Sequence, residues 1–308
     1  MSTFWATVPW PGRPAKVVLC RGRRLACGSD VSDSFHMSER ARRLIFFSLG
    51  IFCCSFATRA QSATIAGQVI RENKEIEIHF PVGKYFQDYA AEGGNPRPTT
   101  GRAVLMFPKG FEPTRPWPIL IVTSTTDGHR TSPMDAGFYE RAATAEGWIV
   151  LASDATIKPR VDTTLWRLGL LAAALQAVRA EWPQSIKWPV VFAGLSGGAK
   201  RSCVLGAMLA TTGSVNIQGL FLAGINEDRL TPACKEYHPP ADFLNVPIWL
   251  SSGMSDFIAT PKLYSHVKTS LELSGFRRVR VESFPGGHEV NAAEVQRALR
   301  WIRQVGRF

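Results

Sequence analysis

Residues 190–210 read VVFAGLSGGAKRSCVLGAMLA, and this stretch decides how the rest of the chain is interpreted. Within it, Gly194 to Gly198 match the pattern G-x-S-x-G, directly after an apolar run and at the start of an apolar helical segment. A strand, a sharp turn and a helix in this order present a serine hydroxyl above a sheet, so Ser196 is predicted to be a nucleophile. Gly194 and Gly198 are expected to form the turn, because larger side chains would collide where the strand and the helix pack. The alternative is a glycine-rich turn in which Ser196 only caps the helix.

Short apolar runs alternate with helical segments from residue 63 onward. Strands are expected at 64–71, 75–81, 103–107, 118–122, 148–153, 188–194, 217–224, 247–253 and 277–284, and helices at 135–146, 162–181, 197–211, 262–274 and 289–303. Continuous apolar runs are typical of strands buried on both faces. The order predicts an α/β fold with a mainly parallel sheet that is covered by helices on both sides. The opening strands before residue 102 are expected to be antiparallel, and the segment 225–246 is too short for a large lid.

A serine hydroxyl is a poor nucleophile without a base. The candidate base is His288 in SFPGGHEV (283–290), where two glycines allow a tight turn after the last expected strand; the alternative is a surface histidine that caps the final helix. The candidate acid is Asp256 in SSGMSDFIATP (251–261), which would orient the imidazole and stabilise its charged form. Glu227 and Asp228 are the alternative acids. The order Ser196, Asp256, His288 is the order in which this strand-turn-helix architecture carries its catalytic residues.

With these residues in place, 100–305 resembles the α/β-hydrolase superfamily, and within it the branch of dienelactone hydrolases, polyhydroxybutyrate depolymerases and prolyl-oligopeptidase-like enzymes. GLSGG (194–198), SGMSD (252–256) and GGHE (286–289) carry the resemblance. It implies an eight-stranded, mainly parallel sheet with helices on both faces. It also implies hydrolysis of esters or peptides through an acyl-enzyme, without a cofactor.

The leading interpretation is a serine hydrolase of the carboxylesterase type that acts on a small ester. A peptidase of the prolyl-oligopeptidase-like type that acts on short peptides is the alternative among enzymes. A catalytically silent binding protein on the same fold is the alternative outside them. No metal site is expected, since the sequence has no CxxC pair and no His/Cys cluster.

The tetrahedral intermediate of such a reaction needs backbone N–H donors. The N–H of Gly197, at the start of the helix, is expected to be one donor. Many esterases of the branch that this chain resembles carry a His-Gly pair after the third strand, and this chain instead has TSTTDGHR at 123–130. The second donor is left open among Ser124, Thr125 and Thr126, and we take the central residue, Thr125, as the candidate. His129 in the same stretch could line the pocket.

Residues 37–60 read MSERARRLIFFSLGIFCCSFATRA, with arginines at 40, 42 and 43 ahead of an apolar run over 44–57, and small residues at 58 and 60. That order is typical of a secretory signal peptide, and an uncut membrane anchor is the alternative. We therefore predict a secreted or periplasmic protein with a catalytic domain over 61–308 and no stable membrane insertion after cleavage. Residues 1–36 are expected to be either an unstructured leader or the result of a misassigned start codon.

The formal charge of +11 is concentrated at the N-terminus. Residues 1–60 hold nine Lys/Arg and three Asp/Glu, which leaves a net charge of +5 on the remainder. Scattered basic residues do not form a phosphate track, so no nucleic-acid partner is expected. After cleavage two cysteines remain, Cys203 and Cys234, which form either a disulfide or two free thiols. The sequence does not give the oligomeric state.

Overall fold

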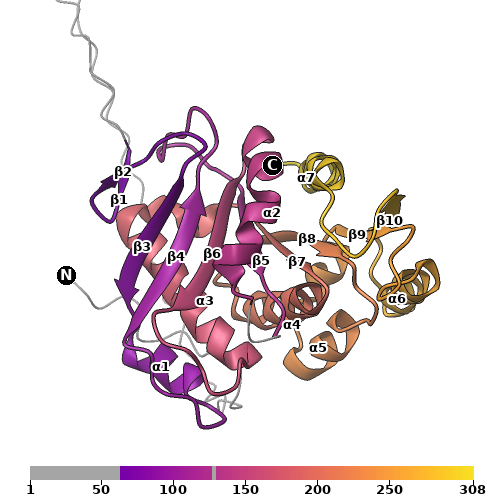
Figure 1. Cartoon of the computed structure of the whole chain (residues 1–308), viewed down its shortest axis with the longest axis horizontal. Helices are drawn as coiled ribbons and strands as arrows, with labels where there is room; N and C mark the ends of the chain where they lie inside the picture. The colour runs from indigo at the N-terminus through magenta and orange to yellow at the C-terminus, as the bar shows by residue number, and fades with distance from the viewer. Residues whose placement is uncertain (1–62, 127–129) are drawn as a thin grey trace, which may run out of the picture. The chain divides into compact units, whose positions relative to one another are not determined.

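An eight-stranded sheet organises the computed structural model, which describes residues 63–126 and 130–308 (Figure 1). The strand order across this sheet is β10-β9-β8-β7-β5-β6-β4-β3. Its strands are β3 (Glu75–Pro81), β4 (Thr100–Met106), β5 (Ile119–Thr123), β6 (Ile149–Ala155), β7 (Val190–Leu195), β8 (Ile217–Ala223), β9 (Ile248–Gly253) and β10 (Val279–Phe284). All neighbours from β6 to β10 pair in parallel, whereas β4 pairs antiparallel with both β3 and β6. The predicted mainly parallel sheet with antiparallel opening strands is therefore confirmed.

Helices cover both faces of the sheet, as predicted. One face carries α2 (Ser132–Ala145) and α7 (Ala292–Gly306), whose buried side chains pack with those of the sheet. The other face carries α1 (Lys84–Ala90), α3 (Thr164–Glu181), α4 (Gly197–Thr212), α5 (Leu230–Tyr237) and α6 (Pro261–Leu273). Two short 3₁₀ turns, Pro183–Lys187 and Ala241–Asn245, precede β7 and β9.

Alternation along each strand sends successive side chains to opposite faces. In β7, Val190 and Phe192 pack with α3, while Val191, Ala193 and Leu195 pack on the α2–α7 side. Every residue of β7 is buried, because the strand lies in the middle of a sheet that has helices on both faces. Since parallel strands all end at one edge, the segments that follow β5, β6, β7, β8, β9 and β10 meet there.

The beginning of the described part of the chain differs from the sequence prediction. A single strand was expected over 64–71, and the structure has the short pair β1 (Thr64–Ile65) and β2 (Gln68–Val69) instead. Ala66 and Gly67 both have positive φ, 47° and 75°, and reverse the chain between them. A run of β-type residues alone does not reveal such a turn when its first position is not glycine.

Two short helices, α1 and α5, were not predicted, and β4 begins at Thr100, three residues before the strand expected over 103–107. Both helices are eight residues or fewer, too short to show a clear helical period in the sequence. Cys203 and Cys234 are free thiols in the structure, with Cys203 buried in α4.

The predictions for residues 1–36 and for a signal peptide over 37–60 concern residues outside the described part of the chain. Within residues 63–126 and 130–308, no helix has both the length and the apolar character needed to cross a bilayer.

Candidate active site

The backbone at Ser196 is held in a conformation that non-glycine residues seldom adopt. Ser196 lies between β7 and α4 with φ 57° and ψ −118°. Such a conformation costs on the order of 1–3 kcal/mol and persists only where the surroundings enforce it. Here the Ser196 N–H donates to the Ala223 carbonyl (2.9 Å), and the Ser196 carbonyl accepts from the Lys200 N–H (3.1 Å). The half-buried Ser196 side chain makes no capping hydrogen bond with α4, so the turn does not serve a helix cap.

Gly194 and Gly198 leave the space that this turn requires. A Cβ atom on Gly194 would overlap the backbone of Gly198, and a Cβ on Gly198 would overlap the Thr123 carbonyl. The hydroxyl of Thr123 also donates to the Gly198 carbonyl (2.7 Å). The end of β5, the end of β7 and the start of α4 therefore touch through backbone atoms, which only glycine at both positions permits.

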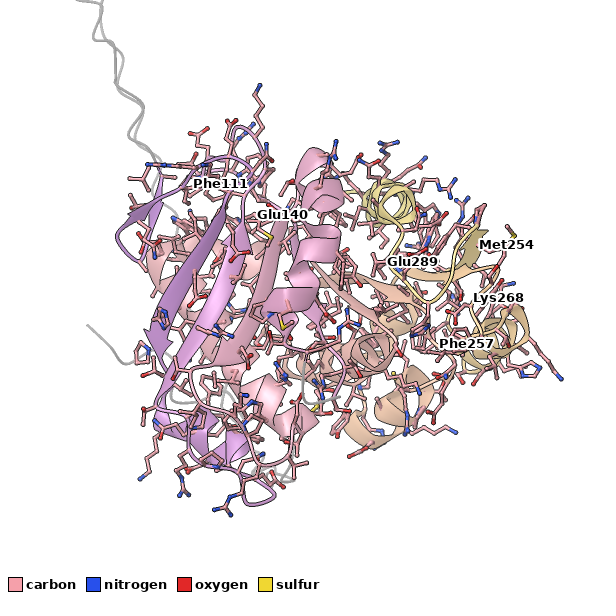
Figure 2. All side chains as sticks on the ribbon, viewed as in Figure 1. Phe111, Glu140, Met254, Phe257, Lys268 and Glu289 are labelled. Carbon is pink, nitrogen blue, oxygen red and sulfur yellow. The ribbon has the colours of Figure 1, made fainter. Side chains whose placement is uncertain are left out.

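Asp256 and His288 meet at the same edge of the sheet, from the segments that follow β9 and β10. The Asp256 Oδ2 atom lies 2.8 Å from His288 Nδ1. The carboxylate side chain is fully buried, whereas 16% of the His288 side chain is exposed. Backbone N–H groups of Ile258 and Ala259 donate to Asp256 Oδ1 at 2.8 Å each. The loop that supplies these donors exposes apolar side chains to solvent at Met254 and Phe257 (Figure 2).

Hydrogen bonds decide the ionisation of Asp256. Burial on its own would raise the pKa of the Asp256 carboxyl. The N–H of Ala259, the hydrogen bond with His288 and the N–H of Ile258 stabilise the charged form, and together they lower the pKa below its usual value. Asp256 is therefore an anion that fixes the imidazole through Nδ1 and leaves Nε2 available.

The alternative acids are engaged elsewhere. Asp228 accepts the N–H groups of Leu230 (2.9 Å) and Thr231 (3.0 Å) at the start of α5, and also the Ser270 hydroxyl (2.6 Å). Glu227 forms ion pairs with Lys200 (3.3 Å) and Arg229 (3.1 Å). Of the three candidate acids, the structure brings Asp256 into hydrogen-bond contact with His288.

Gly224, which sequence reasoning did not single out, places the imidazole beside the turn that holds Ser196. Gly224 follows β8 with φ +54°, and a Cβ there would lie 2.8 Å from His288 Cε1 and 3.1 Å from Leu195 Cδ1. The preceding residue, Ala223, accepts the Ser196 N–H. The His288 ring therefore lies against the same backbone that supports Ser196. The only sequence signal was a glycine that directly follows an apolar strand.

The two candidate oxyanion donors are also side by side. A Cβ on Gly197 would lie 2.5 Å from Thr125 Oγ1 and 3.3 Å from Thr125 Cα. Ser124 is buried and Thr126 is exposed, and the carbonyl of Ser124 accepts a hydrogen bond from Arg201 (3.0 Å). Thr125 is thus the residue of the three that lies against Gly197, the first residue of α4. His129 lies outside the described residues.

Among residues 63–126 and 130–308, no three His, Cys, Asp or Glu side chains gather closely enough to hold a metal ion.

Comparison with known proteins gives the fold. No protein-family model and no curated protein matches the chain by sequence. Among solved structures, a serine hydrolase without a lid from Xanthomonas campestris matches with a TM-score of 0.52 and 16% identity, over 76% of this chain and 96% of that chain. A carboxylesterase from Bacillus cereus matches with a TM-score of 0.45 and 18% identity, over 72% of this chain and 98% of that one. An acylaminoacyl peptidase from Pyrococcus horikoshii matches with a TM-score of 0.49 and 10% identity, over 76% of this chain and 41% of that one.

The strand order, the crossovers and the match to the Xanthomonas structure together define an α/β-hydrolase fold. The predicted resemblance in fold is confirmed. At these identities the similarity shows the fold, and the activity has to be argued from the residues of this chain.

The low pKa of Asp256 predicts a loss of stability in acid. Because the folded-state pKa lies below the value of about 3.9 for an unfolded aspartate, the ionised carboxylate stabilises the fold above about pH 4. This contribution is lost as the pH falls through the folded-state pKa. Urea unfolding of the wild type and Asp256→Asn should show a difference of about 2 kcal/mol near neutral pH that shrinks toward about pH 3. An equal difference at both pH values would contradict this assignment.

Proposed function

We propose that the protein is a serine hydrolase that cleaves carboxylic esters through an acyl-enzyme. The observation that carries the proposal is the strained turn at Ser196 with the Asp256–His288 pair packed against its supporting backbone. A strained, non-capping serine has no structural purpose that a glycine would not serve better. A buried carboxylate that orients a partly exposed imidazole is the arrangement that activates a serine.

In the proposed reaction the Ser196 hydroxyl attacks the ester carbonyl while His288 Nε2 takes its proton. The protonated imidazole then gives that proton to the leaving alcohol, and a water molecule repeats the sequence to release the acid. Asp256 holds the proton on Nδ1, so that Nε2 is the atom with a free lone pair. The buried carboxylate also stabilises the imidazolium that forms in each step.

The negative charge that develops on the carbonyl oxygen is assigned to the N–H groups of Gly197 and Thr125. Gly197 is the first residue of α4, where the helix leaves its N–H groups free and adds a favourable dipole. Thr125 contacts Gly197 from the segment that follows β5. Two backbone donors that need no movement during the reaction are the usual means of lowering such a barrier.

Covalent labelling tests this proposal directly. A fluorophosphonate probe should modify one residue, and mass spectrometry should place the adduct on the peptide that contains Ser196. Ser196→Ala should lose both the label and the hydrolysis of p-nitrophenyl acetate, because the nucleophile is gone while the turn remains. A silent binding protein on this fold would not react. A matched p-nitroanilide separates the peptidase alternative, since an esterase hydrolyses it far more slowly.

The acid assignment is tested by two matched substitutions. Asp256→Asn should lower kcat by about 10⁴-fold, as the loss of the orienting carboxylate does in a serine triad. Asp228→Asn removes a carboxylate from a neighbouring loop and should leave kcat nearly unchanged. The reverse result, with Asp228→Asn impaired and Asp256→Asn active, would show that the wrong acid was chosen.

Export from the cytoplasm is proposed on the order of charged, apolar and small residues over 37–60. N-terminal sequencing of the protein recovered outside the cytoplasm should then begin near residue 61. Recovery of the uncut chain from the membrane fraction would favour an anchor, and recovery of the full chain from the cytoplasm would contradict export.

A further inference from the structure

The peptide unit that joins Ser124 to Thr125 has a fixed orientation. Its carbonyl oxygen accepts a hydrogen bond from Arg201 Nη1 at 3.0 Å, and Ser124 itself is completely buried. A trans peptide unit is planar, so its N–H and C=O groups point in opposite directions. A group that holds the Ser124 carbonyl on one side therefore sets the direction of the Thr125 N–H on the other.

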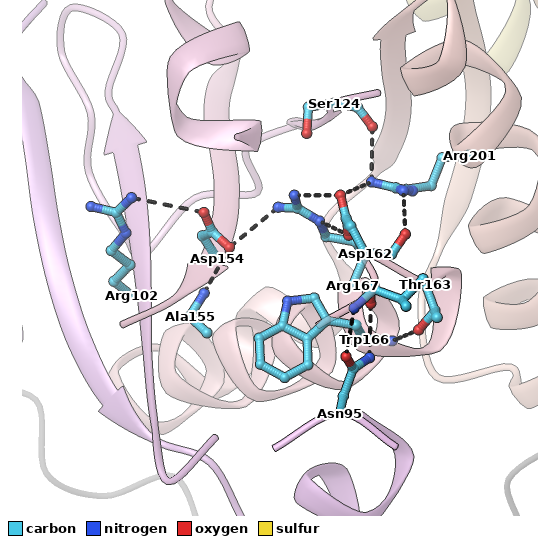
Figure 3. Close-up of polar contacts among 11 residues, drawn as sticks. Asn95, Arg102, Ser124, Asp154, Ala155, Asp162, Thr163, Trp166, Arg167 and Arg201 are labelled. Carbon is cyan, nitrogen blue, oxygen red and sulfur yellow. Dashed lines mark hydrogen bonds and ion pairs between the residues drawn. The ribbon is translucent and has the colours of Figure 1, made fainter. Parts of the chain in front are cut away.

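The guanidinium that makes this bond is itself held in place. Arg201 Nη1 lies 3.2 Å from Asp162 Oδ2, and Nη2 donates to the Asp162 carbonyl at 3.2 Å (Figure 3). Asp162 is bound from the other side by Arg167, whose Nε and Nη2 atoms donate to its two carboxylate oxygens at 2.8 Å each. The Arg201 side chain is 3% exposed and that of Asp162 is 11% exposed. Planar, paired contacts of this kind leave the guanidinium little freedom.

Two consequences follow for the candidate oxyanion site. A cation on the carbonyl side polarises the peptide unit and makes its N–H a stronger donor. The rigid contact also fixes the donor before the reaction begins, which is the condition for electrostatic stabilisation of an oxyanion. Arg201 lies in α4, five residues after Ser196. The helix that begins at the Ser196 turn therefore also holds the loop opposite that turn.

We infer that Arg201 is a positioning residue that aims the Thr125 N–H at the oxyanion, with Asp162 as its anchor. This inference rests on the proposed function. A purely structural role is the competing account, but buried ion pairs contribute little net stability on average. The two accounts differ in what Arg201→Gln changes: the rate of acylation in a fully competent site, or the fraction of protein that is folded.

Burst kinetics with p-nitrophenyl acetate separates them. The burst amplitude gives the fraction of competent sites, and the burst rate gives acylation. Arg201→Gln should keep an amplitude near one per chain while kcat falls about 10- to 100-fold at nearly unchanged KM, which is less than the loss of an entire donor. Arg201→Lys keeps the charge without the planar fork and should lie between this variant and the wild type. Arg201→Lys also allows the acylation rate to be compared with the wild type if Arg201→Gln does not fold.

Arg179→Gln is the matched control. Arg179 donates to a backbone carbonyl in the same way, to Ser214 at 2.6 Å, but at the end of α3 and before β8, away from the site. This variant should lose stability with no change in the burst rate. Wild-type rates per competent site in Arg201→Gln and Arg201→Lys would overturn the inference. A wild-type chain that gives neither a burst nor steady release of p-nitrophenol would instead overturn the proposed function.

A separate observation concerns a cavity of about 610 Å³ beside the same loop. Thr126, which directly follows Thr125, contributes to its wall together with residues 154–162, which form the end of β6 and the loop after it. Glu77, His79 and Arg102, on the adjoining strands β3 and β4, contribute further side chains. The cavity therefore opens at the edge of the sheet where the candidate active site lies.

The acidic side chains of this cavity are neutralised. Glu77 pairs with His79 (3.1 Å) and Arg102 (3.7 Å). Asp154 pairs with Arg167 (3.3 Å), as Asp162 does (2.8 Å).

Lys158 and Arg160, in the loop after β6, are both exposed and have no ion-pair partner among residues 63–126 and 130–308. Among the described residues that line this cavity, the charge that is left over is therefore positive.

We propose that this cavity binds a negatively charged substituent of the ester, such as a carboxylate. Like the first inference, this one rests on the proposed function. The ratio of kcat/KM for p-nitrophenyl hydrogen adipate to that for p-nitrophenyl methyl adipate measures the preference for charge at equal size. The same ratio for 4-acetoxybenzoate and its methyl ester places the charge on the leaving group.

The wild type should prefer the charged member of at least one pair. The double variant Lys158→Gln/Arg160→Gln should reduce that ratio by about fivefold per charge, the size of a Coulomb contact in water. Arg277→Gln/Arg278→Gln removes two exposed charges before β10, at the opposite edge of the sheet, and should leave the ratio unchanged. A wild-type ratio below one for both pairs, or equal losses in both double variants, would overturn the proposal. Failure to hydrolyse the neutral esters would instead count against the proposed function.

Discussion

The close approach of backbone to backbone at the end of β7 is the constraint on which the site depends. Gly194 and Gly198 allow the strand and the helix to touch, and this contact forces Ser196 into its positive-φ conformation. The hydrogen bond from the Ser196 N–H to Ala223 ties the same turn to β8, beside the glycine on which His288 lies. Strain at one residue is thus sustained by three neighbouring strand ends, as expected where a conformation is over-determined by its surroundings.

A buried, hydrogen-bonded ionic group lies on each side of the Ser196 turn. On the β9–β10 side, one carboxylate is kept ionised by backbone donors and orients an imidazole. On the β5–β6 side, two buried arginines share Asp162, and one of them holds the carbonyl of Ser124 (Figure 3). Both arrangements place a buried, hydrogen-bonded ion one step away from the atoms proposed to react. A group that does not touch the reacting atoms still controls the geometry of the residues that do, when its own position is fixed.

The sequence predicted those parts of the structure that depend on local pattern. Apolar runs revealed the strands of the parallel sheet, and glycines around Ser196 revealed the turn, because both signals lie within a few residues of one another. It did not reveal Arg201 and Asp162, which are 39 residues apart, or the bond from Arg201 to Ser124 across 77 residues. An arginine inside a helical segment gives no sign that it is buried until the partner carboxylate is placed beside it. The hairpin at residues 64–69 was missed for a different reason. Ala66 adopts a positive φ, and alanine is not a residue type that predicts such a turn.

The central claim is that Ser196, His288 and the N–H groups of Gly197 and Thr125 surround one reacting carbon. A crystal structure of the protein after reaction with a phosphonate ester tests it most directly, because the tetrahedral phosphorus mimics the intermediate. The account predicts phosphorus bonded to Ser196 Oγ, with one phosphonyl oxygen about 2.7–3.1 Å from both backbone nitrogens. His288 Nε2 should lie within about 3.2 Å of Ser196 Oγ or the leaving-group oxygen. An adduct on another side chain, or a phosphonyl oxygen that faces away from Gly197 and Thr125, would contradict the account.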